Sequence, residues 1–149
     1  MTKNLTRAEA AGFLLSYDNF AILTHRRPDG DTIGSSAALC LGLRSLGKTA
    51  HVLQNDEVTA LYAPLLEGLT KAQPEEGDVL IAVDVAADSM LTKAYADMKN
   101  CIDLRIDHHG SGREYTPNEH VDGESAACAE IIWELLLDMG VPLEEGAGA

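Results

Sequence analysis

The stretch Val79-Leu80-Ile81-Ala82-Val83-Asp84 is a short apolar run that ends on an aspartate. A continuous apolar run of this length is typical of a strand that is buried on both faces of a parallel sheet. Two further runs have the same form: residues 20–24 are followed by His25, and residues 101–106 are followed by Asp107-His108-His109. The sequence therefore predicts three buried strands, each with metal-ligating residue types at its carboxyl end.

Helical patterns alternate with these strands. Thr6-Arg7-Ala8-Glu9 has the form of a capping box, and Gly47 and Gly140 are placed to end helices. Pro64 interrupts one helical segment. The predicted helices cover residues 6–17, 32–46, 58–69, 88–98 and 125–139, a further strand covers 49–54, and 110–122 is an irregular loop. This alternation favours an α/β fold, a doubly wound parallel sheet with helices on both faces.

Composition is consistent with one compact domain, since the chain has 149 residues and is 46% hydrophobic. No apolar run approaches the roughly 20 residues of a membrane helix, and no secretory signal is evident, so we expect a cytoplasmic protein without a membrane partner. The three cysteines, Cys40, Cys101 and Cys128, are widely spaced in apolar patterns and are predicted to be reduced core residues. Trp133 is likewise predicted to lie in the core.

The polar residues at the strand ends should meet, because ligands bind outside the carboxyl ends of the strands in an open parallel sheet. Carboxylates and imidazoles without thiolates suit hard to borderline cations such as Mn²⁺, Mg²⁺ or Co²⁺. The acidic groups are too numerous for one closed zinc site. Two cations about 3.5–4 Å apart, bridged by a carboxylate, clamp a phosphoryl group and activate water. The pattern therefore predicts two-metal hydrolysis of a phosphate ester.

Each segment also has a simpler interpretation. Asp84 alone could be a cap or turn former, Asp29-Gly30-Asp31 could be a loop in which Asp31 caps a helix, and His108-His109 could be solvated. The joint occurrence at three strand ends favours the metal site. His51 and His120 belong to no motif and are predicted to be ordinary surface or core-edge histidines.

The residues resemble the DHH phosphoesterases, a RecJ-like family named for the Asp-His-His present here at residues 107–109. The first motif of that family fits His25, Asp29-Gly30-Asp31 and Gly34-Ser35, and the second fits Asp84. Residues 124–135 are similar to the helix that follows the third motif in the nanoRNase and 3′-phosphoadenosine-5′-phosphate (PAP) phosphatase branch.

The resemblance implies two metal sites that share Asp84. The ligands of one would be His25, Asp29 and Asp84, and those of the other Asp31, Asp84 and His108. His109 would bind the substrate phosphate or donate a proton to the leaving oxygen, and Asp107 would orient the histidines.

Two further residues are candidates for contact with substrate. Arg26 lies inside the first motif and could touch a phosphate, although an arginine in a loop is often a solvated residue. Near Gly34 and Ser35, the free N–H groups of a helix N-terminus could receive a phosphate, whereas simple helix packing would also select a glycine there.

The net charge of −13 disfavours a surface that follows a long nucleic-acid backbone. A short oligonucleotide or nucleotide substrate fits better. The activities that the family resemblance implies are those of an exonuclease or oligoribonuclease, or the hydrolysis of PAP. A manganese-dependent pyrophosphatase-like enzyme is the alternative, and an inactive metal-binding domain is a third interpretation.

The family's fourth-motif aspartate and smaller C-terminal substrate-binding domain find no counterpart in residues 1–149. We therefore expect this chain to be the N-terminal part of such a protein and only weakly active alone. An uncovered sheet edge and helix face would favour self-association, in the simplest case as a homodimer.

Overall fold

The computed structural model describes residues 2–110 and 113–142, and these build one parallel sheet covered on both faces. The strand order is β1-β7-β6-β5-β2-β3-β4, and every strand pair in the described chain is parallel. The strands are β1 (Lys3–Asn4), β2 (Phe20–Leu23), β3 (Ala50–Leu53), β4 (Thr70–Lys71), β5 (Val79–Val83), β6 (Leu104–Asp107) and β7 (Asn118–Val121). The three strands predicted from apolar runs, β2, β5 and β6, are neighbours at the centre.

The chain reverses its direction of travel across the sheet between β2 and β5. It runs from β2 to β3 through α2 (Gly30–Ser45), and from β5 to β6, the opposite way, through the 3₁₀ helices η2 (Asp88–Met90) and η3 (Lys93–Cys101). Because such crossovers are right-handed, opposite directions place the connections on opposite faces. The predicted doubly wound α/β fold is therefore confirmed, with a topological switch point between β2 and β5.

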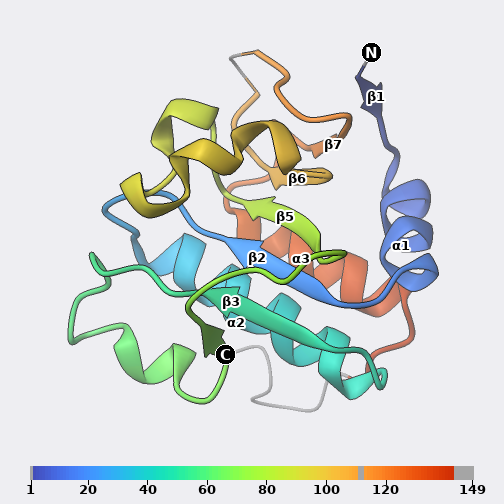
Figure 1. Cartoon of the computed structure of the whole chain (residues 1–149). Helices are drawn as coiled ribbons and strands as arrows, with labels where there is room; N and C mark the ends of the chain where they lie inside the picture. Colours follow the sequence, from blue (N-terminus) through green and yellow to red (C-terminus); the bar gives the residue numbers. More distant parts are fainter. Residues whose placement is uncertain (1, 111–112, 143–149) are drawn as a thin grey trace.

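The two faces are covered differently (Figure 1). Helices α1 (Arg7–Ser16), α2 and α3 (Cys128–Asp138) pack on one face, where they bury the larger hydrophobic core together with side chains of β2, β5 and β6. The other face is covered by η2, η3 and adjoining segments, whose Leu91, Tyr95 and Ile102 pack on Leu23 and Ala82. The central strands are buried on both sides, which is why they read as unbroken apolar runs.

Helix α1 begins as predicted. The Thr6 side chain accepts a hydrogen bond from the Glu9 N–H, and the Glu9 carboxylate accepts one from the Thr6 N–H, so the capping box is complete.

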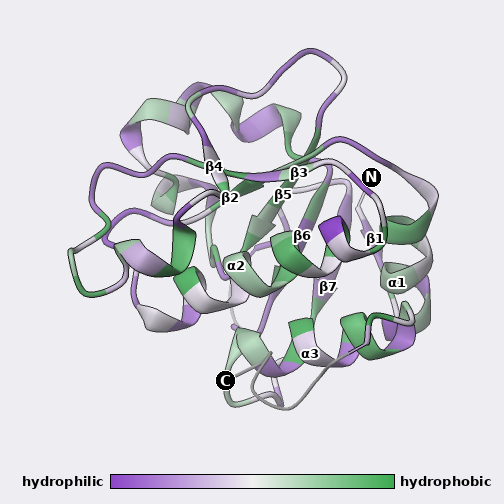
Figure 2. Cartoon of the chain, turned by 90° about the horizontal axis from the view of Figure 1, so that it is seen from below, coloured by the Kyte–Doolittle hydropathy of each residue, from purple (hydrophilic) through white to green (hydrophobic). Residues whose placement is uncertain are grey.

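Helix α3 shows a clear apolar stripe toward the sheet, with alternating hydrophobic and hydrophilic segments in Figure 2. Its buried residues are Cys128, Ile131, Ile132, Leu135 and Leu136. The prediction of a core Trp133 is wrong, because Trp133 falls outside this stripe and is 40% exposed.

Several expected elements differ from the structure. The segment predicted as a helix over 58–69 holds only the 3₁₀ helix η1 (Ala63–Leu66), which contains Pro64 and is followed by β4. The helix predicted over 88–98 is the pair η2 and η3. The loop predicted over 110–122 contains β7, a strand whose polar side chains hid it from the pattern. Cys101 is exposed, contrary to prediction, whereas Cys40 and Cys128 are buried and reduced.

No helix within residues 2–110 and 113–142 has the length and apolar character needed to cross a membrane.

Candidate metal centre

The loop after β2 brings His25 and Asp29 to the carboxyl edge of the sheet. Asp29 is the N-cap of α2, with its Oδ1 accepting from the Thr32 N–H at 3.0 Å. The cap is therefore Asp29, two residues before the Asp31 considered from sequence. His25 Nε2 lies 3.8 Å from Asp29 Oδ1, and the buried His25 ring makes a 2.6 Å hydrogen bond through Nδ1 with the carbonyl of Arg26.

Asp84 lies directly after β5, at the centre of the site. Its backbone has a φ of 63°, a left-handed conformation that is unusual for a residue other than glycine. The two oxygens of its carboxylate face different histidines: Oδ2 is 3.9 Å from His25 Nε2, and Oδ1 is 3.3 Å from His108 Nε2. Asp84 therefore stands between two groups of side chains, as the resemblance implied for a bridging residue. Backbone strain of this kind is characteristic of functional sites.

The second group consists of His108, from the end of β6, and Asp31, from the first turn of α2. His108 Nε2 lies 3.5 Å from Asp31 Oδ2. Asp31 is also held from the other side, because its oxygens accept hydrogen bonds from the N–H groups of Cys128 and Ala129 at 3.0 Å each. Ser35 Oγ donates to Asp31 Oδ1 at 3.2 Å. Asp31 thus joins α2, α3 and the cluster.

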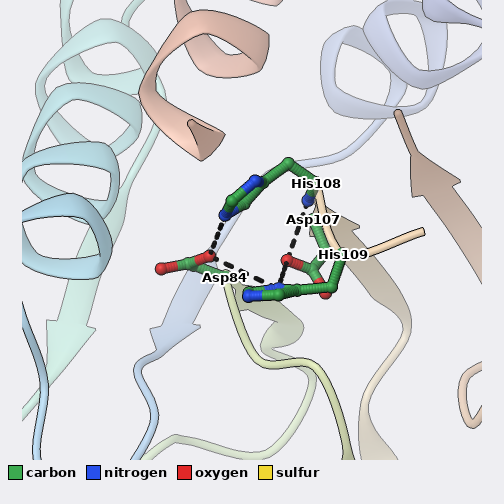
Figure 3. Close-up of side chains that lie close together, drawn as sticks. All are labelled: Asp84, Asp107, His108 and His109. Carbon is green, nitrogen blue, oxygen red and sulfur yellow. Dashed lines mark hydrogen bonds and ion pairs between the residues drawn. The ribbon is translucent and has the colours of Figure 1, made fainter. Parts of the chain in front are cut away.

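Asp107 and His109 form a separate pair beside Asp84 (Figure 3). His109 Nδ1 lies 2.6 Å from Asp107 Oδ1, the same oxygen that accepts from the His108 N–H at 2.8 Å. The Asp107 side chain is fully buried, whereas the His109 side chain is 42% exposed. With Nδ1 engaged by Asp107, His109 has Nε2 for contact with another molecule.

The site concentrates negative charge. Burial raises the pKa of Asp84 to about 8, and the carboxylates of Asp31, Asp107 and Asp29 add to the rise. Burial also raises the pKa of the Cys128 thiol well above its ordinary value. The thiol is therefore neutral and adds no negative charge to the site. A buried group of carboxylates of this kind favours the binding of cations.

Three observations test whether the residues fit divalent cations. Asp84 Oδ1 is buried and, within the described chain, accepts no hydrogen bond, so it has a free lone pair directed into the cluster. His25 engages Nδ1 with a backbone carbonyl, which is the arrangement that leaves Nε2 free to ligate a metal. The facing donor atoms are 3.3–3.9 Å apart, close to the roughly 3–3.5 Å expected between neighbouring ligands of one cation. The residues fit two cations that share Asp84.

The candidate substrate residues are placed differently. Arg26 is exposed, and its backbone N–H donates to the carbonyl of Met90. Ser35 is fully buried and its hydroxyl is directed at Asp31. Apart from its chain neighbours and the backbone of α2 itself, no described heavy atom would lie within 4 Å of a Cβ at Gly34, so close packing against another element does not explain this glycine.

Two polar residues of the site were not identified from sequence. Arg105 precedes Asp107 by two residues on β6, and its Nη2 lies 3.2 Å from Asp107 Oδ2. A basic residue in an apolar strand, in register with a motif residue, was an available signal, because positions i and i+2 share a face. Glu119, which pairs with Arg105, gave no signal because β7 was predicted to be a loop.

The fold and the cluster together define a class: an α/β protein with a carboxylate and imidazole centre at the switch point of a parallel sheet. Residues 19–147 match the DHH family, N-terminal domain. The chain belongs to the DHH family.

Individual proteins with similar sequences include the bifunctional oligoribonuclease and PAP phosphatase NrnA of Thermus thermophilus, 32% identical over 124 residues that cover 80% of this chain and 37% of that protein. A probable NrnA of Streptococcus mutans is 26% identical over 89% of this chain and 43% of its own length. The chain thus spans about two fifths of the length of these curated relatives.

Solved structures support the fold. An exopolyphosphatase-related protein from Bacteroides fragilis superposes with a TM-score of 0.69 at 23% identity, covering 91% of this chain and 44% of that one. Exonuclease RecJ bound to manganese superposes with a TM-score of 0.57 at 20% identity, covering 91% and 38%. At these identities the likeness establishes the shared architecture.

Proposed function

We propose that this chain carries the catalytic centre of a metal-dependent phosphoesterase that hydrolyses short oligonucleotides or 3′-phosphoadenosine-5′-phosphate. The observation that carries the proposal is the position of Asp84, whose two carboxylate oxygens face His25 and His108 separately. A shared carboxylate between two sets of ligand atoms is the arrangement that two-metal phosphoryl chemistry requires.

In this proposal His25, Asp29 and Asp84 would hold one cation, and Asp31, Asp84 and His108 would hold the other. Two divalent cations bound there would supply positive charge to the phosphoryl group and lower the pKa of a bound water. Mn²⁺ fits the mixed oxygen and nitrogen donors, and Mg²⁺ or Co²⁺ would fit them as well. Asp29, Asp31 and Asp84 would hold the ions, whose positive charge would balance that of the three carboxylates.

The proton transfer is assigned to His109. Asp107 accepts from His109 Nδ1–H and fixes the orientation of the ring. When the ring carries a proton on both nitrogens, His109 can donate to the substrate phosphate or give the Nε2 proton to the leaving oxygen, which leaves the proton on Nδ1 with Asp107. Of the four side chains drawn in Figure 3, that of His109 is the most exposed to solvent. A residue that contacts substrate must be accessible in this way.

The substrate class is proposed from the relatives, because the names of the Thermus and Streptococcus proteins refer to oligoribonuclease and PAP phosphatase activity. The net charge of −13 supports a short substrate, since a long strand would meet repulsion from the surface. Exposed Arg26 is proposed to approach a substrate phosphate. A cytoplasmic location is part of the proposal.

The experiment is a hydrolysis assay with the purified chain, Mn²⁺ and either a diribonucleotide or 3′-phosphoadenosine-5′-phosphate, with pyrophosphate as the comparison substrate. We expect turnover of a nucleotide substrate that EDTA abolishes and added Mn²⁺ restores. Asp84→Asn should remove it, whereas His51→Ala, on β3, should not. Turnover of pyrophosphate alone would favour the pyrophosphatase alternative, and metal binding without any turnover would favour the inactive domain.

A further inference from the structure

Arg105 is a buried cation in the central sheet. Its side chain is 3% exposed and lies between two carboxylates that are as deeply buried, Asp107 and Glu119. Nη2 lies 3.2 Å from Asp107 Oδ2, and Nη1 lies 3.1 Å from Glu119 Oε1. One guanidinium thus spans both acids.

The strand register produces this alignment. Arg105 and Asp107 are two residues apart on β6 and therefore project from the same face. Glu119 is the direct partner of Arg105 on the neighbouring strand β7. The face is the one opposite α2 and α3, since Leu104 and Ile106 of β6 pack in the helix-covered core.

Arg105 and Glu119 also bind residues 113–116, which follow the Asp-His-His motif. Glu119 Oε2 accepts from the N–H groups of Tyr115 and Thr116 and from the Thr116 hydroxyl. Arg105 Nη1 donates to the carbonyl of Arg113 at 3.3 Å, and the Tyr115 ring covers the guanidinium at 5.1 Å. Tyr115 in turn donates its hydroxyl proton to the carbonyl of Val85, next to Asp84.

This segment forms one wall of a cavity of about 340 Å³. The cavity is lined by Ala86, Ala87, Asp88, Arg113, Glu114 and Tyr115. Residues 86–88 follow Asp84 closely along the chain. A shift of the Arg105 side chain would therefore affect both Asp107 and the Arg113 and Tyr115 wall of this cavity.

Burying three charges carries a desolvation cost that an apolar cluster of equal volume would avoid, so such a group is weak evidence for stability alone. Its geometry indicates a different role. Arg105 donates a hydrogen bond to Asp107 Oδ2, and the other oxygen, Oδ1, faces His109 Nδ1.

We propose that Arg105, supported by Glu119, is a positioning residue that orients the Asp107–His109 pair. This inference rests on the proposed function, in which His109 faces substrate. In this proposal Arg105 acts through Asp107 and is given no contact of its own with substrate or metal. A guanidinium is required because its planar fork meets two carboxylates at once, which an ammonium group cannot do in the same geometry.

The experiment compares the wild-type chain with Arg105→Lys, which retains the charge and loses the fork, and with Glu119→Gln, which retains the shape and loses the second acid. ¹⁵N NMR of the His109 imidazole in the metal-free chain reports which ring nitrogen carries the proton. In the wild type we expect the proton on Nδ1, in Arg105→Lys a mixture of the two tautomers, and in Glu119→Gln a smaller shift toward that mixture. In the hydrolysis assay Arg105→Lys should lower kcat by about 10- to 100-fold with little change in KM.

Asp78→Asn is the matched control, because Asp78 forms a partly buried ion pair with Lys71 at 2.6 Å elsewhere in the sheet. It should lower stability and leave the His109 tautomer unchanged. A wild-type tautomer in Arg105→Lys, with only the melting temperature lowered, would overturn the inference. If the wild type hydrolyses no substrate, the proposed function fails, and the tautomer measurement still decides the role of Arg105.

Discussion

Asp31 caps a helix to which it does not belong: its Oδ2 accepts a hydrogen bond from the backbone N–H of Cys128, the first residue of α3, at 3.0 Å. The Ala129 N–H donates to the other oxygen. The residue at the N-cap of α3, Ala127, has no side-chain oxygen, so a carboxylate on α2 takes over that role. Asp31 therefore links the candidate metal centre to the packing of α2 against α3.

This arrangement predicts that Asp31→Ala destabilises the chain even without metal. Loss of a cap costs about 0.5–2 kcal/mol of the free energy of unfolding, measurable by urea denaturation in EDTA. Asp97→Ala, at an exposed position in η3, is the control and should change little. Equal stability of Asp31→Ala and the wild type would show that the cap contributes nothing.

The buried carboxyl of Asp84 predicts a pH dependence of stability in the absence of metal. Its folded-state pKa of about 8 lies above the ordinary value of 3.8, so the folded chain holds this proton more tightly than the unfolded chain. The contribution of Asp84 is therefore most favourable below about pH 4 and is lost as the pH rises toward 8. Denaturation in EDTA should show this loss in the wild type, and Asp84→Asn should flatten it. Parallel profiles would contradict the assignment.

Two glycines of α2 provide a matched pair of substitutions. A Cβ at Gly42 would collide with the side chain of Leu136 on α3, so Gly42→Ala should cost about 1–3 kcal/mol. A Cβ at Gly34 would meet no described heavy atom within 4 Å, so Gly34→Ala should be neutral or stabilise by up to about 1 kcal/mol. Thermal melting in EDTA distinguishes the two, and a destabilising Gly34→Ala would show that the first turn of α2 is more tightly packed than described.

His109 is expected to serve catalysis without holding a metal. His109→Ala should lower kcat by about 10²- to 10⁴-fold, because it removes a positioned proton donor. The affinity for Mn²⁺ should stay near the wild-type value, since the candidate ligands are untouched. An equal loss of Mn²⁺ affinity would instead make His109 a ligand.

The sequence predicted the centre of this fold better than its edges. β2, β5 and β6 are buried on both faces, and their apolar runs are direct consequences of that burial. β7 could not be found in this way, because Glu119 and His120 are polar and are buried through tertiary contacts, such as those with Arg105 and with the carbonyl of Leu5. Such tertiary hydrogen bonds leave no periodic pattern in one sequence.

The candidate site shows the same division. The residues of the three motifs could be placed together because parallel strands end at one edge. The hydrogen bonds from α3 to Asp31 and the pairing of Arg105 with Glu119 could not be predicted, because both join segments that are distant in the chain. Trp133 shows that a residue one step from an apolar stripe falls outside it.

The central claim is that Asp84 joins two cation sites, and titration of the metal-free chain with Mn²⁺ by isothermal calorimetry tests it most directly. We predict two Mn²⁺ per chain for the wild type and for His51→Ala. Asp84→Asn should weaken both ions, because it removes the anionic bridge between His25 and His108. Affinity and stoichiometry in Asp84→Asn equal to those of the wild type would contradict the claim.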